Sequence, residues 1–208
     1  MIMIVDYGRG NLFSIAQACK HLGVDPRISG DPAVIAEADG IILPGVGAFG
    51  AAMAELEKRG LVGPLCDAAL RGTPVLGICL GMQLLMTGSE EFGSFDGLGL
   101  IEGSVKKLVG PNKEAANQVR IPNVGWRTLN VMENSTMLRG LGENPMVYFT
   151  HSYGCFLAEQ SHVSATISVN SVEIPVAVHY KNIVGYQFHP EKSGALGLEM
   201  IQRFLELC

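Results

Sequence analysis

The residue types that can do chemistry point first to Cys79. It lies within Gly77-Ile78-Cys79-Leu80-Gly81, where an apolar run meets the start of an amphipathic segment. This spacing has the form of a nucleophile elbow, because a sharp strand-to-helix turn requires small residues on both sides of the nucleophile. The N-terminus of the following helix would favour the thiolate, and the Leu80 N–H would face a developing oxyanion. The alternative is a core cysteine packed between two glycines.

A cysteine nucleophile needs a base that later returns a proton to the leaving group. The segment Gln187-Phe188-His189-Pro190-Glu191 offers one. An apolar run would deliver His189 at the end of a strand, and the proline stops that strand. Glu191 can turn back to hold one imidazole nitrogen and fix the tautomer. Taken alone, the same segment could be a surface turn.

The two segments together supply a nucleophile, a base and an orienting acid. Cys79 and His189 each follow a predicted strand, and sites of parallel sheets form outside those strand ends. We therefore predict a catalytic triad of Cys79, His189 and Glu191. Of the other histidines, His151 falls in a possible binding loop.

A glycine loop at residues 45–50 matches G-x-G-x-x-G, which is the fingerprint of a dinucleotide-binding turn. Pro44 is unusual before such a turn, and no acidic residue closes a following strand, since Asp67 falls in a predicted helix. We favour a loop whose peptide N–H groups, at Val46 and Gly47, turn toward an oxyanion. Dinucleotide binding stays as the alternative from another functional class.

These segments need a sheet that ends its strands at one edge. In the first half of the chain, short apolar runs alternate with helical patterns, which predicts an α/β fold: a mainly parallel central sheet with helices on both faces. The expected strands cover residues 2–6, 26–29, 40–43 and 74–78. The expected helices cover residues 12–21 after an Asn11 cap, 51–59, 64–71 and 80–86, and another begins at Asp31-Pro32.

The second half predicts an added antiparallel section, because its strand-like runs are joined by short turns. These runs cover residues 105–109, 124–130, 146–150, 163–169, 174–180 and 183–188, and a closing amphipathic helix covers residues 195–207. Residues 110–118 form the most polar stretch and are expected to be an exposed loop. We expect a single domain over residues 1–208.

The composition of the chain argues against several classes of function. The chain has 208 residues, 48% of them hydrophobic and 17% charged, with a net charge of −5. These values suit one domain with a large core, and the absence of a basic face argues against nucleic acid as a partner. No leader or apolar stretch of about 20 residues is present, so we expect no membrane association and a cytoplasmic location. The five cysteines lack metal-site or disulfide spacing, so we expect free thiols and no metal or cofactor.

Taken together, these motifs resemble the class I (triad) glutamine amidotransferases, which have a flavodoxin-like fold. Within that class, the chain is most similar to the glutaminase subunits of imidazole glycerol phosphate synthases. The resemblance covers essentially the whole chain, and its further motifs are Asp6-Tyr7-Gly8-Arg9-Gly10-Asn11, Pro44-Gly45-Val46-Gly47-Ala48-Phe49, Gly125-Trp126 and Phe149-Thr150-His151-Ser152-Tyr153.

The resemblance implies hydrolysis of L-glutamine to glutamate and ammonia through a cysteine thioester. It implies that a barrel-type cyclase or synthase subunit, in a heterodimer, uses the ammonia to make imidazole glycerol phosphate and AICAR in histidine biosynthesis. The oxyanion would be held by Val46, Gly47 and Leu80. Gly45, Gln83, His151, Ser152 and Tyr153 would bind the substrate, and Asn11 and Trp126 would face the partner.

One departure from the family pattern concerns the partner. The family usually has Pro-His, a short apolar residue and then Gly-Trp-Asn, whereas this chain has Asn123 and Arg127 in place of the histidine and the last asparagine. A related glutaminase subunit that supplies ammonia for amination of a surface-polysaccharide sugar therefore stays as an alternative. A non-catalytic module would need a broken triad, and a hydrolase of other γ-glutamyl substrates is a further alternative.

Overall fold

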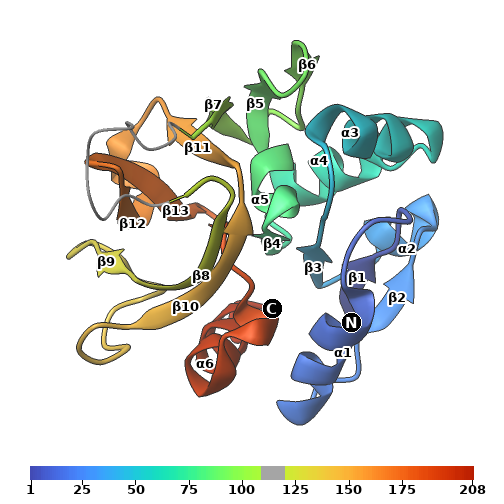
Figure 1. The fold of residues 1–208 in the computed structure, drawn as a ribbon. Coiled ribbons are helices and arrows are strands. Elements are labelled where there is room, and N and C mark those ends of the chain that lie inside the picture. Colours follow the sequence, from blue (N-terminus) through green and yellow to red (C-terminus); the bar gives the residue numbers. More distant parts are fainter. Residues whose placement is uncertain (109–119) are drawn as a thin grey trace.

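The computed structural model describes residues 1–108 and 120–208, so the loop expected at residues 110–118 lies outside the described residues. The fold is α/β, as predicted, with an eight-stranded sheet, a four-stranded sheet and a two-stranded ribbon (Figure 1). Together these elements place the turn that carries Cys79 and the segment that carries His189 at one edge of the large sheet.

The elements follow one another along the chain in alternation at first and then mostly as strands. The helices are α1 (Leu12–His21), α2 (Pro32–Ala36), α3 (Phe49–Lys58), α4 (Val62–Leu70), α5 (Leu80–Leu84) and α6 (Gly194–Leu205), with short 3-10 turns η1 (Gln160–His162) and η2 (Pro190–Lys192). The strands are β1 (Ile2–Val5), β2 (Arg27–Ser29), β3 (Gly40–Leu43), β4 (Val75–Ile78), β5 (Met86–Ser89), β6 (Phe95–Asp96), β7 (Ile101–Lys107), β8 (Asn123–Thr128), β9 (Asn130–Val131), β10 (Met146–His151), β11 (Tyr153–Leu157), β12 (Val163–Val169), β13 (Val172–Tyr180) and β14 (Ile183–Tyr186).

The large sheet has the strand order β2-β1-β3-β4-β14-β13-β12-β9. Its first five strands are parallel, whereas β13, β12 and β9 pair antiparallel. Strands β4 and β14 are direct neighbours, with Gly77 opposite Gly185 and Ile78 opposite Tyr186. Because these two strands are parallel and in register, the residues that follow them leave the sheet side by side.

The two faces of the sheet bury different sides of each strand. In β1, Met3 and Val5 join a core that includes residues of α2, α3, α4 and α5, whereas Ile2 and Ile4 join a core with α1 and α6. Successive strand residues point to opposite faces, so a strand buried throughout requires a covering layer on each side. Figure 1 shows α3 and α4 on one side of β1 and β3, with α1 and α6 on the other. Helices on both faces are thus confirmed.

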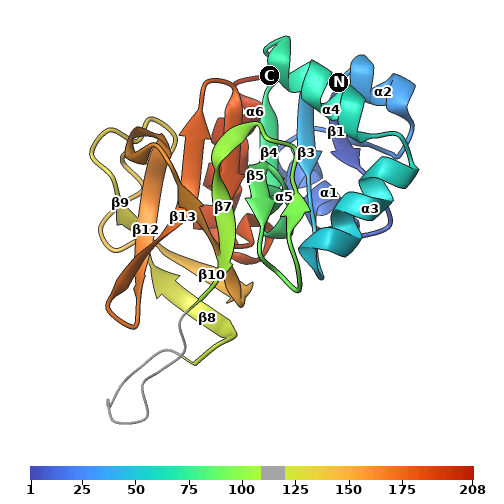
Figure 2. The same cartoon turned by 90° about the horizontal axis from the view of Figure 1, so that it is seen from above.

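The ribbon of β8 and β10 packs on the antiparallel half of the sheet (Figure 2). Val147 and Phe149 of β10 belong to the same buried core as Ile174 and Val176 of β13. The ribbon therefore reaches the large sheet through side chains, without pairing to it as a further strand.

Several sequence expectations about elements were wrong. The helix expected at residues 80–86 ends at Leu84, and β5 begins at Met86. Strand β6 and strand β11 were not predicted, and β7 begins at Ile101 rather than at residue 105. These strands belong to the four-stranded sheet, where pairing with residues far along the chain overrides weak local periodicity. Asp31 caps α2 through a bond from the Ala33 N–H, 2.9 Å, whereas Asn11 precedes α1 without a side-chain cap bond.

Backbone contact explains why glycines surround the elbow between β4 and α5. A Cβ at Gly81 would lie 1.8 Å from the Leu43 carbonyl oxygen, and one at Gly77 would lie 2.8 Å from the backbone of Gly81. A Cβ at Gly45 would lie 2.7 Å from the Tyr7 hydroxyl and 2.8 Å from the Leu80 Cβ. The glycine loop and the elbow therefore touch, and each leaves no room for a side chain on the other.

We expect Gly81→Ala to destabilise the protein strongly, because the added methyl group meets backbone that cannot move aside. The free energy of unfolding should fall by about 3 kcal/mol, at the upper end of overpacking substitutions. Urea unfolding measures this as a lower midpoint. The matched control is Gly63→Ala in α4, where a Cβ meets no atom within 4 Å. Equal midpoints for the two variants would contradict this account of the elbow.

Candidate active site

Cys79 occupies the turn between β4 and α5 with a backbone conformation that non-glycine residues rarely adopt. Its φ is 57° and its ψ is −111°. Its N–H donates to the Tyr186 carbonyl, 2.7 Å away at the end of β14. Strained backbone of this kind persists only where its surroundings enforce it, and here the packed glycines do so. The sharp strand-to-helix turn predicted at Cys79 is therefore present, with the sulfur at the N-terminus of α5.

His189 follows β14 and is fixed through its own backbone. Its N–H donates to the Tyr148 carbonyl of β10 at 3.0 Å, and its carbonyl accepts from the Ser193 hydroxyl at 2.7 Å. The ring Nδ1 lies 2.9 Å from Oε1 of Glu191, whose side chain is fully buried. Since the carboxylate accepts, Nδ1 carries a hydrogen and Nε2 is the nitrogen free for the thiol.

Charge and burial act against each other at His189. Burial lowers the pKa of the ring, but the neighbouring Cys79 sulfur and the Glu191 carboxylate outweigh it and raise the pKa to about 9. Apart from Cys79, no described residue is placed to bond Nε2. The ring therefore holds its proton at neutral pH beside the Cys79 sulfur.

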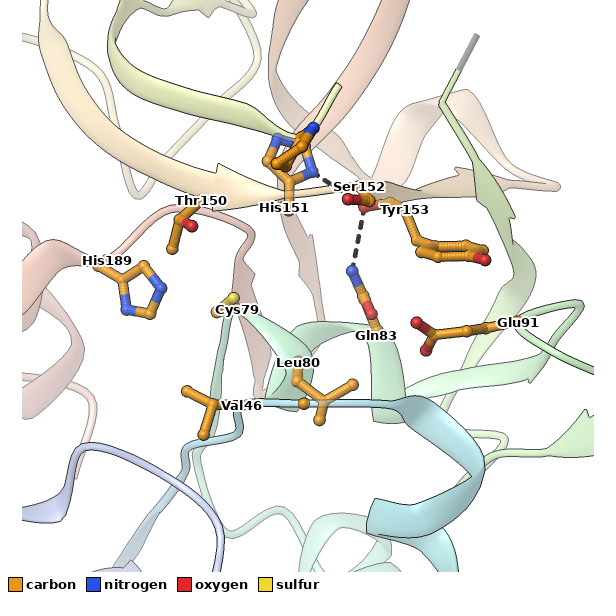
Figure 3. Close-up of a pocket in the computed structure, with 12 residues that line it drawn as sticks. Val46, Cys79, Leu80, Gln83, Glu91, Thr150, His151, Ser152, Tyr153 and His189 are labelled. Atoms are coloured by element: carbon orange, nitrogen blue, oxygen red, sulfur yellow. Dashed lines mark hydrogen bonds between the residues drawn. The ribbon is translucent and has the colours of Figure 1, made fainter. Parts of the chain in front are cut away.

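A pocket of about 320 Å³ opens over the sulfur. Figure 3 shows Cys79 and His189 on one wall, Val46 and Leu80 below them, and His151, Ser152 and Tyr153 above. Its lining residues are Val46, Gly47, Cys79, Leu80, Gln83, Glu91, Pro122, Thr150, His151, Ser152, Tyr153 and His189. The structure thus gathers segments from five distant parts of the chain around one space.

Most of the residues predicted from sequence lie in this pocket, and a few do not. Glu191 lies behind His189 and outside the pocket lining. Gly45 also lies outside the lining and packs beneath it against Tyr7 and Leu80, so close packing accounts for this glycine. Contact with the elbow explains Gly45, a φ of 97° explains Gly47, and contact with the Phe95 ring explains Gly50, so the glycine match needs no dinucleotide.

Asn11 and Trp126 lie away from the pocket lining. Trp126 is 47% exposed, and its ring meets Tyr148 edge-on with centroids 6.1 Å apart. Because the Tyr148 carbonyl also accepts the His189 N–H, this exposed tryptophan lies two contacts from His189. Asn11 is partly buried at the start of α1.

The wall opposite Val46 is held by hydrogen bonds from both sides. Nδ1 of His151 lies 2.9 Å from the Tyr153 carbonyl, and the Gln83 amide donates to the same carbonyl at 3.1 Å (Figure 3). Burial lowers the pKa of His151 to about 4, so this ring is neutral at pH 7. The Gln83 amide also donates to Oε1 of Gln187 at 3.0 Å. Its two hydrogens are therefore used within the protein, and only its oxygen is left for a ligand.

Glu91 is a pocket residue that sequence reasoning missed. Its carboxylate lines the pocket although the residue is only 8% exposed, and Oε2 accepts from the Phe49 N–H at 2.7 Å. It thereby holds the first turn of α3, where a helix N-terminus favours an anion. In sequence it is one of two adjacent glutamates, Glu90 and Glu91, and only burial separates them. Thr150 and Pro122 were likewise missed.

Among residues 1–108 and 120–208, no group of three His, Cys, Asp or Glu side chains is arranged to hold a metal ion. None of the described helices combines the length and the apolar character that crossing a bilayer requires.

Comparison with known proteins matches the chain over nearly its whole length. The family profile Glutamine amidotransferase class-I matches residues 3–207. The imidazole glycerol phosphate synthase subunit HisH of Streptococcus mutans is 43% identical over 208 residues and covers 100% of both chains. The same subunit of Listeria monocytogenes is 44% identical over 207 residues, which is 100% of this chain and 96% of that protein.

Solved structures agree on the fold at much lower identity. A protein described as glutamine amidotransferase superimposes with a TM-score of 0.72 at 18% identity, covering 100% of this chain and 98% of that one. PurLQS from Thermotoga maritima gives 0.73 at 22% identity, covering 99% and 97%. With a matching profile, full-length relatives above 40% identity and a nucleophile elbow beside a histidine, the chain belongs to the class I glutamine amidotransferases.

Proposed function

We propose that this chain hydrolyses L-glutamine to glutamate and ammonia, with Cys79, His189 and Glu191 as its catalytic triad. The observation that carries the proposal is the convergence of Cys79 and His189 in one pocket, at the ends of the neighbouring parallel strands β4 and β14. Glu191, buried behind the imidazole, supplies the orienting carboxylate.

In the first half of the reaction, the Cys79 thiolate attacks the side-chain carbonyl carbon of glutamine. The carbonyl electrons move to oxygen, and the N–H groups of Val46, Gly47 and Leu80 stabilise the resulting oxyanion. One well-placed donor of this kind lowers the barrier by about 3 kcal/mol. His189 then donates its Nε2 proton to the departing nitrogen, so ammonia leaves and a thioester remains on the sulfur.

In the second half, the now neutral His189 removes a proton from water. The hydroxide attacks the thioester, and collapse of the tetrahedral intermediate releases glutamate and restores the Cys79 thiolate beside the imidazolium. Glu191 keeps the Nδ1 proton in place throughout, so Nε2 is the nitrogen that exchanges protons.

The other end of glutamine needs groups for an ammonium and a carboxylate. Glu91 is the anionic side chain of the pocket lining, and it suits the α-ammonium group. We assign His151, Ser152, Tyr153 and the Gln83 oxygen to the same end of the substrate, above Gly45 and the glycine loop. Figure 3 shows Glu91 and Tyr153 at the end of the pocket away from His189.

Ammonia is useful only where a second enzyme receives it, so the chain should act as a subunit. Relatives over its full length, 39% to 44% identical, carry the name of an imidazole glycerol phosphate synthase subunit. We therefore assign it the glutaminase role beside a barrel-type synthase subunit that makes imidazole glycerol phosphate and AICAR in histidine biosynthesis. Asn11 and Trp126 would lie in the docking face of this heterodimer.

One observation favours a second candidate for the acceptor. Asn123 and Arg127 depart from the pattern of the resembled subunits on the strand that carries Trp126. A partner that aminates a surface-polysaccharide sugar would leave the triad chemistry unchanged and would meet this strand at the half-buried Arg127, since Asn123 is completely buried. Mass spectrometry of the protein that co-purifies with the chain separates the two.

Cys79→Ala should abolish glutamine hydrolysis, because the covalent intermediate cannot form. The matched control is Cys66→Ala, which removes a half-buried thiol that bonds the Leu98 carbonyl. Glutamate release, followed in a coupled assay, should fall by at least about a thousandfold in the first variant and stay close to the parent rate in the second. Turnover by Cys79→Ala at the parent rate would remove the nucleophile assignment.

Glu191→Gln should lower both the pKa of His189 and the rate. The amide oxygen can still accept from Nδ1, but the negative charge is lost, so we expect the pKa to fall from about 9 by about one unit or more. The imidazolium is then lost at a lower pH, and glutamine turnover at pH 8 should drop about tenfold or more. NMR titration of the ring protons measures the pKa. Glu199→Gln, which removes an exposed carboxylate on α6, is the control and should leave the pKa of His189 unchanged.

Glu91→Gln should weaken substrate binding more than chemistry. The amide oxygen can keep the bond from the Phe49 N–H while the charge for the α-ammonium disappears. We expect KM for glutamine to rise about tenfold or more and kcat to change about threefold at most. The neighbouring Glu90→Gln, which removes an exposed carboxylate, controls for net charge. A change in kcat alone would place Glu91 at the reacting end.

A further inference from the structure

A series of hydrogen-bonded side chains runs from β8 to His151 at the pocket wall. Its outer members lie outside the site described above. Nε of Arg127 donates to Oδ1 of Asn123 at 3.1 Å, and Nδ2 of Asn123 lies 2.9 Å from Nε2 of His151. Asn123 and His151 stand directly opposite each other in the pairing of β8 with β10. Asn123 is completely buried and Arg127 is half-buried, and neither lines the pocket.

The direction of hydrogen-bond donation along this series of side chains is determined at its inner end, at His151. The Tyr153 carbonyl only accepts, so Nδ1 of His151 carries the hydrogen. The buried ring is neutral, which leaves Nε2 bare and able to accept from the Asn123 amide. Asn123 must then turn its oxygen toward Arg127, which only donates. Each donor thus meets an acceptor, and the amide at position 123 supplies both the donor for His151 and the acceptor for Arg127.

The series of hydrogen bonds continues past His151 to the Cys79 sulfur. The Tyr153 carbonyl that accepts from His151 also accepts from Gln83, and the same Gln83 amide donates to Gln187. Nε2 of Gln187 in turn lies 3.9 Å from the Cys79 sulfur. Figure 3 shows the section from His151 through Tyr153 to Gln83 along the upper wall of the pocket.

We propose that Asn123 and Arg127 are positioning residues for glutamine binding: through His151 they hold the Tyr153 carbonyl and the Gln83 amide at the pocket wall. Neither residue touches the substrate. The two departures from the family pattern are therefore a matched pair, since the arginine donor needs the asparagine oxygen. This inference rests on the proposed glutaminase function.

The test uses a probe that binds like glutamine and reacts with the nucleophile. The probe is 6-diazo-5-oxo-L-norleucine, which alkylates a thiol with loss of N₂. Intact-mass spectrometry follows the rate of labelling against probe concentration. The concentration for half-maximal rate reports binding, and the maximal rate reports chemistry at Cys79. Iodoacetamide, which has no amino-acid end, measures the reactivity of the thiol by itself.

Two variants interrupt this series of hydrogen bonds, one at its half-buried outer end and one at the buried asparagine. Arg127→Met keeps the aliphatic stem of a half-buried side chain, so folding should be retained, and Asn123→Leu removes both bonds of the buried amide. We expect the half-maximal concentration to rise about threefold in Arg127→Met and about tenfold in Asn123→Leu, with little change in maximal rate or in iodoacetamide labelling. Asn130→Leu, an exposed asparagine on β9, is the matched control and should behave as the parent.

A third variant tests the direction of hydrogen-bond donation between Asn123 and His151. In Asn123→Asp the new carboxylate only accepts, so His151 would have acceptors at both nitrogens and would favour the imidazolium form. We expect NMR titration to show the pKa of His151 raised by more than about one unit from its low parent value. Asn130→Asp adds the same charge elsewhere and should leave this titration unchanged.

The outcomes separate this inference from the proposed function. If the parent chain shows no saturable labelling of Cys79 by the probe, the glutaminase assignment fails. If the parent is labelled with saturation and Arg127→Met and Asn123→Leu match it in half-maximal concentration, the positioning role is wrong while the glutaminase assignment stands. An unchanged His151 titration in Asn123→Asp would also overturn the proposed direction of donation.

Discussion

The close contact between the elbow and the strand beside it is the constraint on which the site depends. Cys79 adopts a φ of 57° because its peptide lies between the Tyr186 carbonyl on one side and the packed glycines on the other. The Leu43 carbonyl occupies the space that a side chain at position 81 would need. The strain at Cys79 is therefore balanced by backbone packing across three parallel strands, and the sulfur is held at the edge of the sheet.

The pocket joins two parts of the fold that the sheet alone would not bring together. The parallel half supplies Cys79 and the glycine loop. The end of β10 and the start of β11 supply the upper wall, and β10 also accepts the His189 N–H through the Tyr148 carbonyl. Because the exposed Trp126 meets Tyr148, a partner that binds there would contact the ribbon that holds the backbone of His189.

The charge state of each histidine in this pocket depends on the groups that its ring contacts. His189 and His151 are both buried, yet the pKa of His189 is raised and that of His151 is lowered. The difference follows from their partners, since His189 faces a sulfur and a carboxylate whereas His151 faces a carbonyl and an amide. Two histidines in one pocket thus differ in charge at pH 7, since His189 carries a proton on both ring nitrogens and His151 is neutral.

The local pattern of the sequence was enough to predict the alternation of strands and helices, the elbow at Cys79 and the pairing of His189 with Glu191. Hydrophobic periodicity and the residue preferences of turns are local properties, and each of these features spans only a few residues. The tertiary structure decided what rests on distant contacts. Strand β6 and strand β11 form because of their partners, and Glu91 differs from Glu90 only by burial against α3. Likewise, Asn123 and Arg127 were visible as departures from a pattern, but their link to His151 appears only when β8 lies against β10, because hydrogen bonds between strands leave no trace in local spacing.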